Sequence, residues 1–376
     1  MAILSKEVKK MNLGIITYHN TRNCGAVLQA YALQRVLLDR DIKTDIIDYR
    51  CREIEQTYKI KKIKDIKGLK ELVKWALTVQ RDKITQKKFD EFKRKHIKLS
   101  SKYDRINIQN ANEYYDAFVT GSDQVWNFNL NGGDTVYLLD FAGKGKKKIS
   151  YAASMGGSAM PPGFAEKTAR ALQTFDAVSV RETALAQYIK TLTGAEPQTV
   201  LDPTLLLTKE KYAFEEKEKP KKKYIFVYTI ANTPNIERCA KALSRETGFP
   251  VIWGHMSYRK KSGVENMTTL SPVEFVNYIR NAEYVLTSSF HGMAFSVIME
   301  KQFFYDLDKG EANNNSRLET LAELLNLQCR ELNESDLDLT QKKNIDYNTV
   351  NRLLNDARQR SLVFLEKSVC FDCENN

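Results

Sequence analysis

Cysteine, histidine and long apolar runs are scarce in this chain of 376 residues. The six cysteines are Cys24, Cys51, Cys239, Cys329, Cys370 and Cys373. So few and so scattered, they exclude the disulfide framework of a small secreted domain and favour a reducing compartment. Only Cys370 and Cys373 form a C-x-x-C pair, and no second pair or histidine cluster accompanies it, so we expect no metal site there.

No uncharged stretch is long enough to cross a bilayer. A notably apolar one, Tyr284–Met299, is shorter than the roughly 20 apolar residues that are required, and it contains serines and a histidine. The N-terminal residues become charged from Lys6 onward and so lack the apolar core of a secretory signal. We therefore expect a cytoplasmic protein, and the length suggests two domains.

The excess positive charge is confined to one segment. Residues 50–105 hold 19 Lys and Arg against 8 Asp and Glu, a net charge of +11 that equals the formal charge of the whole chain. Within the segment, apolar residues recur at helical spacing beside Trp75, which predicts an amphipathic basic helix. These residues are Ile66, Leu69, Leu72, Val73, Ala76, Leu77 and Ile84.

Two interpretations of this helix stay open. It could attach the protein to an anionic membrane surface or to a pyrophosphate-bearing substrate. A helical insertion packed on its own domain, with a solvated outer face, would show the same pattern. We do not expect nucleic acid as a partner, because no helix-turn-helix, zinc-finger or aromatic RNA-binding signature accompanies the charge.

Short β-branched runs alternate with helical patterns, which is typical of parallel sheets joined by helices. The predicted strands are Leu13–Thr17, Thr44–Ile47, Ala117–Thr120, Ile149–Ala153, Val178–Val180, Thr199–Leu201, Tyr224–Tyr228, Val251–Trp253, Tyr284–Leu286 and Phe303–Tyr305. The charged segment Lys209–Lys223 interrupts the pattern, and Thr349–Lys367 predicts a terminal helix. We therefore predict an α/β fold with two parallel sheets facing a cleft. The first domain is 11–208, with a basic helical insertion at about 50–105, the second is 209–345, and a helix and tail follow at 346–376.

Two phosphate-binding glycine motifs are missing. Neither G-x-G-x-x-G nor G-x-x-x-x-G-K-[ST] occurs, so the sequence offers no dinucleotide fingerprint and no P-loop. We expect no bound cofactor.

Polar loops follow several predicted strands, where parallel sheets hold their ligands. After the first strand, His19 and Arg22 lie in a loop, and Gly25 begins a helix whose free N–H groups favour an anion. A capped surface turn would look similar. After the third strand, Asp123 and Gln124 would face the cleft.

An arginine and a histidine stand at two further strand ends. Arg181 suits bidentate contact with a carboxylate or phosphate, although an ion pair with Glu182 is the alternative. His291 lies between an apolar strand and an apolar helix, where it suits proton transfer unless it is a structural core histidine.

In this order, these segments resemble the polysaccharide pyruvyl transferase family, from Met11 to about Asn333. The motifs that carry the resemblance are Thr17-Tyr-His-Asn20, Asn23-Cys-Gly-Ala-Val-Leu-Gln29, Thr120-Gly-Ser-Asp-Gln-Val-Trp126, Ser179-Val-Arg-Glu182, Leu201-Asp-Pro203, Thr287-Ser-Ser-Phe-His-Gly292 and Asn315-Ser-Arg-Leu-Glu319. The resemblance implies two Rossmann-like domains arranged as in GT-B glycosyltransferases. It also implies transfer of the enolpyruvyl unit of phosphoenolpyruvate to two hydroxyls of one sugar, which leaves a cyclic pyruvate ketal on a capsular or other cell-surface polysaccharide precursor.

The resemblance also implies roles for individual residues. Arg181 would hold the donor and His291 would handle protons. Where some relatives have a donor-binding arginine, this chain has Ser289, and Arg22, His19 or Arg317 could supply the second cation instead. The expected donor contacts are Asn23, Gly25, Arg181, Ser288, Ser289, Phe290, His291 and Gly292. The expected acceptor contacts are His19, Arg22, Asp123 and Gln124.

The family further suggests a saccharide acceptor linked to undecaprenyl diphosphate, which would give the basic segment a purpose at the inner face of the membrane. Two other functions are compatible with the same sequence: a GT-B-type glycosyltransferase that uses a nucleotide sugar, and a non-catalytic binding protein of polysaccharide assembly.

Overall fold

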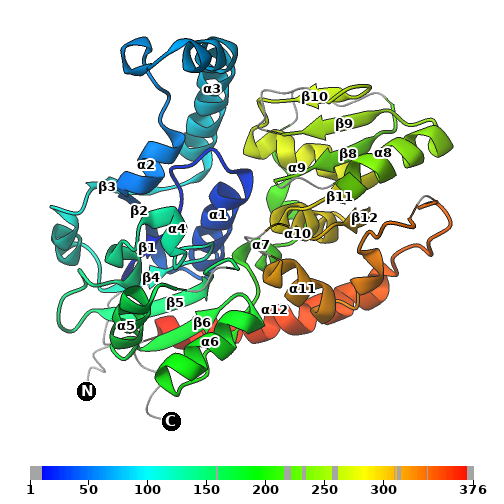
Figure 1. Cartoon of the computed structure of the whole chain (residues 1–376). Coiled ribbons are helices and arrows are strands. Elements are labelled where there is room, and N and C mark those ends of the chain that lie inside the picture. Colours follow the sequence, from blue (N-terminus) through cyan, green and yellow to red (C-terminus); the bar gives the residue numbers. More distant parts are fainter. Residues whose placement is uncertain are drawn as a thin grey trace.

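The computed structural model describes residues 11–157, 160–215, 222–230, 234–255, 261–308, 310, 315–336 and 338–370. In these ranges the chain forms two parallel sheets flanked by helices (Figure 1). The first sheet has the order β3-β2-β1-β4-β5-β6-β7 and the second β10-β9-β8-β11-β12. The prediction of two α/β halves with parallel sheets is confirmed.

The strands of the first sheet are β1 (Asn12–Ile16), β2 (Lys43–Tyr49), β3 (Leu99–Tyr103), β4 (Ala117–Thr120), β5 (Lys147–Ala153), β6 (Ala177–Val180) and β7 (Gln198–Thr199). Those of the second are β8 (Ile225–Tyr228), β9 (Val251–Gly254), β10 (Glu265–Met267), β11 (Tyr284–Thr287) and β12 (Gln302–Tyr305).

The helices are α1 (Cys24–Leu38), α2 (Arg52–Tyr58), α3 (Leu69–His96), α4 (Phe128–Asn131), α5 (Pro162–Leu172), α6 (Thr183–Thr193), α7 (Pro203–Leu206), α8 (Pro234–Thr247), α9 (Pro272–Asn281), α10 (Phe290–Ile298), α11 (Ser316–Leu324) and α12 (Tyr347–Val369). Short 3-10 turns are η1 (Ile63–Asp65), η2 (Ile108–Glu113), η3 (Thr135–Leu138), η4 (Lys209–Tyr212) and η5 (Gln328–Arg330).

The basic segment 50–105 differs from its prediction. It holds two helices, α2 and α3, and its last part is not helical, because Leu99–Tyr103 forms the edge strand β3. Ser100, Ser101 and Lys102 give this strand no apolar alternation that the sequence could reveal. The predicted strand Thr199–Leu201 is also shifted, since β7 ends at Thr199.

One apolar core runs through both halves of the molecule. It joins side chains of α1 and the first sheet to side chains of α9, α10 and α12. Helix α1 contacts α7 and α9, and α10 contacts α7. The terminal helix α12 packs back on the first sheet, where the Ser361 Oγ accepts a hydrogen bond from the Leu201 N–H at 3.0 Å. The two sheets are therefore fixed to one another, and the strand ends of both face the same region (Figure 1).

Candidate active site

Four neighbouring strands of the first sheet end side by side at one site. Because β4, β5, β6 and β7 are adjacent, the residues that follow them are brought together: Asp123, Ser154, the pair Arg181 and Glu182, and Asp202. Parallel sheets hold their ligands outside the carboxyl ends of the strands, so this edge is the expected place for chemistry.

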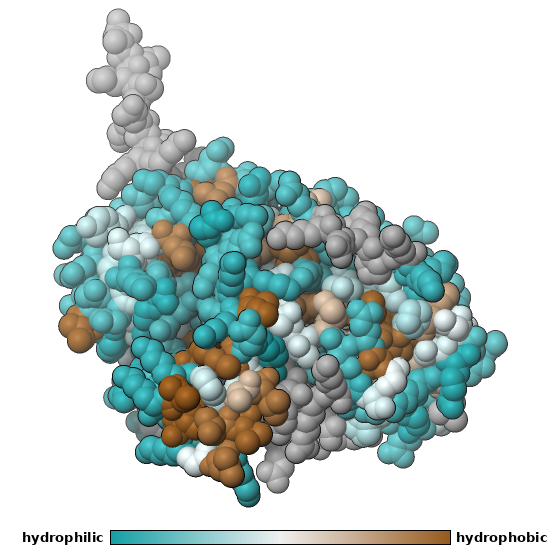
Figure 2. Space-filling model, turned by 90° about the horizontal axis from the view of Figure 1, so that it is seen from above, coloured by the Kyte–Doolittle hydropathy of each residue, from teal (hydrophilic) through white to brown (hydrophobic). Residues whose placement is uncertain are grey.

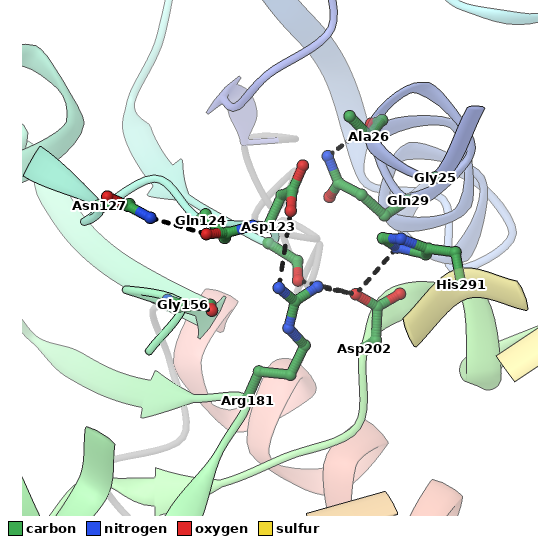
Figure 3. A network of polar contacts seen from close by, with 12 residues as sticks. Gly25, Ala26, Gln29, Asp123, Gln124, Asn127, Gly156, Arg181, Asp202 and His291 are labelled. Carbon is green, nitrogen blue, oxygen red and sulfur yellow. Dashed lines mark hydrogen bonds and ion pairs between the residues drawn. The ribbon is translucent and has the colours of Figure 1, made fainter. Parts of the chain in front are cut away.

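Arg181 stands at the centre of this edge (Figure 3). Its guanidinium is buried and lies within ion-pair distance of three carboxylates: 2.7 Å from Asp202, 3.6 Å from Asp123 and 3.9 Å from Glu182. It also lies over the ring of Phe290, 4.8 Å from the centroid. Burial opposes its charge, but Asp202, Asp123 and Glu182 raise its pKa above the ordinary value. The ion pair with Glu182, anticipated as an alternative, is thus one of three.

A second arginine, Arg317, reaches the cluster from α11 in the other domain. It is buried, and both its burial and its repulsion by Arg181 lower its pKa to about 10. The neighbouring Ser316 donates a hydrogen bond to the Gly156 carbonyl at 3.4 Å, which ties the start of α11 to the first domain. Of the three cations suggested in place of an arginine at Ser289, Arg317 is the one whose charge interacts with Arg181.

His291 joins the cluster from α10. Its Nε2 atom lies 3.7 Å from the Asp202 carboxylate, and the ring is buried. The other side of the ring contacts Gly25 of α1 so closely that a Cβ on Gly25 would lie 2.0 Å from Nδ1. The absence of a side chain at Gly25 therefore allows the N-terminus of α1 to meet the imidazole.

Both helices that meet here begin with a capped first turn. The side chain of Asn23 accepts hydrogen bonds from the N–H groups of Gly25 and Ala26, and Ser289 accepts one from Gly292. These local bonds start α1 and α10 at the site, where helix N-termini favour an anion. Asn23 and Ser289 were expected as donor contacts, and in the structure their side chains cap helices.

Asp202 organises the cluster, although its local sequence predicts no role beyond a place in a family motif. It caps α7, accepts hydrogen bonds from Thr204 and Ser122, and pairs with Arg181. Burial opposes ionisation, but the interactions with His291 and Arg181 lower the pKa of Asp202 well below its usual range. The signal that could have found it is an Asp-Pro pair directly after a predicted strand.

Glu182 is a second acid of the cluster, for which the sequence predicted only an ion pair with Arg181 as an alternative. It is fully buried, which raises its pKa above the usual value, while Arg181 and Arg317 oppose this shift. The hydroxyl of Ser154 donates to one of its oxygens at 2.7 Å, and the Met155 N–H donates to the same oxygen.

The predicted acceptor residues separate into two groups. Asp123 and Gln124 belong to the cluster region, and Gln124 accepts a hydrogen bond from Asn127 at 2.7 Å (Figure 3). His19 and Arg22 point elsewhere. The His19 Nε2 lies 2.9 Å from Asp48 in a separate ion-pair network.

Arg22 faces α2 and α3. Its guanidinium donates to Gln86 at 3.4 Å and lies over the ring of Tyr58. Ser288, which was expected at the donor, accepts a hydrogen bond from the Ile230 N–H at 3.2 Å. The roles of these residues stay predictions.

Several buried polar atoms of the cluster form no hydrogen bond within the described chain. They are Nε and Nη2 of Arg181, Nε2 of His291 and Oε2 of Glu182. Such atoms are rare in folded proteins, and a group of them points to a ligand site. A cavity of about 300 Å³ adjoins Arg181, with Asp202, Phe290 and Arg317 also in its wall, whereas His291 and Glu182 do not line it. Its volume is that of a site for a small molecule.

The described ranges contain neither a metal centre nor a membrane span. In them, no group of three or more His, Cys, Asp and Glu side chains is arranged to hold a metal ion. Among the described helices, none is both long and apolar enough to span a bilayer. Of the C-terminal cysteine pair, Cys370 is exposed at the end of α12, and Cys373 lies outside the described residues.

Fold and site together define a two-domain α/β protein whose domains enclose a buried cluster of arginines, carboxylates and one histidine. Residues 23–305 match the family model described as polysaccharide pyruvyl transferase, which covers most of the chain. The protein therefore belongs to the polysaccharide pyruvyl transferase family, and this family makes it a transferase of polysaccharide biosynthesis. No curated protein sequence matches the chain.

The solved structures that the chain resembles share little of its sequence. They include the S. aureus MnaA–UDP co-structure, at 14% identity and a TM-score of 0.49 over 95% of this chain and 96% of that one. UDP-GlcNAc 2-epimerase of Methanocaldococcus jannaschii, in complex with UDP-GlcNAc and UDP, shares 12% identity, with a TM-score of 0.46 over 95% of this chain and 100% of that one. E. coli ADP-heptose lps heptosyltransferase II shares 10%, with a TM-score of 0.41 over 93% and 99%. Identities this low say nothing about the substrate.

Proposed function

We propose that the protein transfers the enolpyruvyl group of phosphoenolpyruvate to two hydroxyls of a saccharide, forming a cyclic pyruvate ketal and releasing phosphate. The observation that carries the proposal is the cluster around Arg181. Its guanidinium is held by carboxylates, yet two of its buried nitrogens have no hydrogen bond within the described residues. A planar guanidinium with such donors suits the carboxylate or the phosphate of phosphoenolpyruvate.

The surroundings of Arg181 support an anionic ligand. Arg317 adds a second buried cation, and the N-termini of α1 and α10 add the partial positive charge of their helix dipoles. Phosphoenolpyruvate carries two anionic groups, and in this proposal Arg181 and Arg317 supply one cation for each. The carboxylates of Asp202 and Asp123 hold Arg181 in place.

His291 is the proposed proton carrier. In the proposed sequence a proton adds to C3 of the donor, which makes C2 electrophilic, and the first sugar hydroxyl adds to C2. Phosphate then leaves, and the second hydroxyl closes the ring. One hydroxyl proton replaces the proton delivered to C3, and the other leaves with phosphate. Asp202, 3.7 Å from Nε2, stabilises the charged imidazole between these transfers.

The acceptor in this proposal is a saccharide precursor of a capsule or other exopolysaccharide, linked to undecaprenyl diphosphate. The family supports a saccharide acceptor, and the lipid link is our extension of it. Asp123 and Gln124, on the first-domain side of the cluster, are the proposed acceptor contacts.

The test combines a lipid-linked glycan extract with phosphoenolpyruvate. We expect phosphate release in equal amount to a ketal-linked pyruvyl group that mass spectrometry finds on the glycan. His291→Gln should lower turnover by about 10²- to 10⁴-fold, the range for loss of a general acid or base. His255→Gln is the matched control, because His255 is a buried histidine of the second domain with a hydrogen bond to Asn266.

Two results would contradict the proposal. Wild-type turnover of a folded His291→Gln variant would remove the proton carrier. Sugar transfer from a nucleotide sugar, without pyruvylation, would instead establish the glycosyltransferase alternative.

A further inference from the structure

The N-terminal half of α3 projects from the body of the molecule (Figure 1). The buried residues of this helix are Thr78, Thr85, Phe89, Phe92 and Lys93. The first nine residues, Leu69–Leu77, therefore have no buried member, although they include five large apolar side chains. The C-terminal half of α3 is thus the part that anchors the helix to the fold.

The apolar side of the projecting half faces outward. Leu69, Val73 and Leu77 are 76%, 52% and 66% exposed. They lie at helical spacing on one side of α3, whereas the buried positions further along, Thr78 and Thr85, lie on the opposite side and are polar. A surface helix of a globular protein normally has the reverse arrangement.

These side chains form a continuous apolar patch, which we call the α3 tip. Its residues are Ile63 of η1 and Leu69, Leu72, Val73 and Leu77 of α3. Figure 2, which views the molecule from the side on which α3 projects, shows apolar side chains gathered there and bordered by hydrophilic ones. Exposed patches of this kind mark a surface that binds a partner or a membrane. The alternative that α3 packs its apolar stripe on its own domain is thereby contradicted for this half.

The border of the α3 tip is strongly basic. Between Lys59 and Lys74 there are seven lysines and only two acids, Asp65 and Glu71, so this stretch carries a net charge of +5. An apolar patch without the lysines would fit a protein partner equally well. The combination of outward apolar side chains with a surrounding field of lysines is the pattern of helices that bind anionic lipid.

The base of α3 is tied to the loop between β1 and α1 and to the second domain. Gln86 accepts a hydrogen bond from Arg22, and Lys93 donates one to Asn20 at 2.6 Å. Arg22 and Asn20 both lie in the loop between β1 and α1. Lys88 bridges to Glu274 of the second domain at 2.7 Å. Seventeen residues separate Leu69 from Gln86, which at the α-helical rise is about 25 Å. The tip thus lies about 25 Å from the contact with the loop that leads into α1, the helix that begins at the candidate active site.

We propose that the α3 tip docks the protein onto the surface of an anionic phospholipid bilayer. The apolar side chains enter the interface between headgroups and acyl chains, and the lysines around them pair with lipid phosphates. This proposal rests on α3 alone, so its test does not depend on the reaction proposed for the active site.

Co-sedimentation of the full chain with vesicles tests the proposal. We expect binding to phosphatidylcholine vesicles that contain phosphatidylglycerol, little binding to pure phosphatidylcholine, and release by salt. The triple variant Lys67→Glu, Lys70→Glu, Lys74→Glu should bind on the order of a hundredfold more weakly, because each lysine near an anionic surface contributes to binding. The triple variant Leu69→Gln, Val73→Gln, Leu77→Gln should bind about tenfold or more weakly.

Matched triple variants separate a local effect from a general one. Lys144→Glu, Lys167→Glu, Lys367→Glu makes the same change in net charge at exposed sites away from α3. Ile106→Gln, Leu130→Gln, Val363→Gln removes exposed apolar side chains elsewhere. Both controls should bind like the wild type.

Three results would overturn the proposal. The first is that the wild-type protein fails to bind anionic vesicles. The second is that the α3 variants bind as well as their controls. The third is a wild-type dimer that ignores vesicles and dissociates when Leu69, Val73 and Leu77 are replaced, which would make the α3 tip an interface between copies of the chain.

Discussion

Gly25 and His291 come from different domains and touch at the starts of α1 and α10. A glycine is required because any Cβ at position 25 would overlap the imidazole, 2.0 Å from Nδ1. The position of His291 beside Asp202 therefore depends on the absence of a side chain at Gly25.

Replacing Gly25 with alanine should displace His291. We expect Gly25→Ala to lower turnover by about 10²-fold or more, through loss of proton transfer, and to lower the free energy of unfolding by about 1–3 kcal/mol, as overpacking does. Gly163→Ala is the control, since a Cβ there meets nothing within 4 Å and alanine stabilises a helix. Wild-type turnover in Gly25→Ala would show that the close contact has no catalytic importance. Kinetic assays and urea unfolding measure the two effects.

Asp202 should make the free energy of unfolding depend on pH in the acid range. Its pKa in the folded protein is lower than the ordinary value, so the unfolded chain takes up a proton first as the pH falls. The stabilisation is therefore fully present above about pH 4 and is lost as the pH falls below that value.

Asp202→Asn should lower the free energy of unfolding at neutral pH by about 3 kcal/mol, because Arg181 loses its closest partner in a buried ion pair. It should also weaken the loss of stability in acid and abolish donor binding. Asp48→Asn is the control, since interactions with His19 and Arg50 lower the pKa of Asp48 to about 2 against the effect of burial, in a network separate from Arg181. Loss of donor binding in both variants would contradict a specific role for Asp202. Unfolding curves at several pH values provide the measurement.

The sequence predicted Arg181 and His291 from their positions after apolar strands, and the structure places the two side chains on the same carboxylate of Asp202. It did not predict the role of Asp202 itself, or of Arg317, from local pattern. Both depend on strand order and on the approach of the two domains, which are long-range features with no local signature. His19 and Arg22 looked equally suitable in the sequence, yet they contact Asp48 and Gln86 instead.

At the scale of single elements, α3 combines two halves with different roles. The second half holds Phe89 and Phe92 in the core, and the first half exposes its apolar residues. The predicted helix was therefore right in its periodicity, while the side that faces the protein changes along its length. Periodicity finds an apolar stripe but not what covers it.

The two halves should respond differently to substitution. Leu69→Gln, Val73→Gln, Leu77→Gln together should change the free energy of unfolding by less than about 1 kcal/mol, because exposed side chains contribute little to stability. Phe89→Ala should lower it by about 3–5 kcal/mol through the cavity it leaves. Urea unfolding compares them, and a large loss in the triple variant would mean that the α3 tip is packed in solution.

Two edge strands were not predicted from the sequence. Strands β3 and β10 lie at the edges of their sheets, and their residues alternate too weakly to stand out from loops. Apart from β7 and β12, the strands that were predicted lie inside the sheets. These inner strands are continuous apolar runs in the sequence because helices cover both faces of each sheet.

At the scale of the whole molecule, the two sheets share one apolar core. Side chains of α1, α9, α10 and α12 meet in it, and α12 crosses from the second sheet to the first. We expect thermal unfolding to give a single calorimetric transition, whose calorimetric and van't Hoff enthalpies agree. Two resolved transitions would show that the domains unfold independently.

The central claim is that Arg181 binds phosphoenolpyruvate, and calorimetric titration of the purified protein tests it most directly. Arg181→Lys should weaken binding at least tenfold, because lysine cannot reproduce the guanidinium fork. Arg330→Lys is the control, since Arg330 is equally buried in the second domain and lies over the ring of Phe304. Saturable binding of phosphoenolpyruvate that is weakened only in Arg181→Lys is the predicted result. Binding of a nucleotide sugar with no binding of phosphoenolpyruvate would contradict the account.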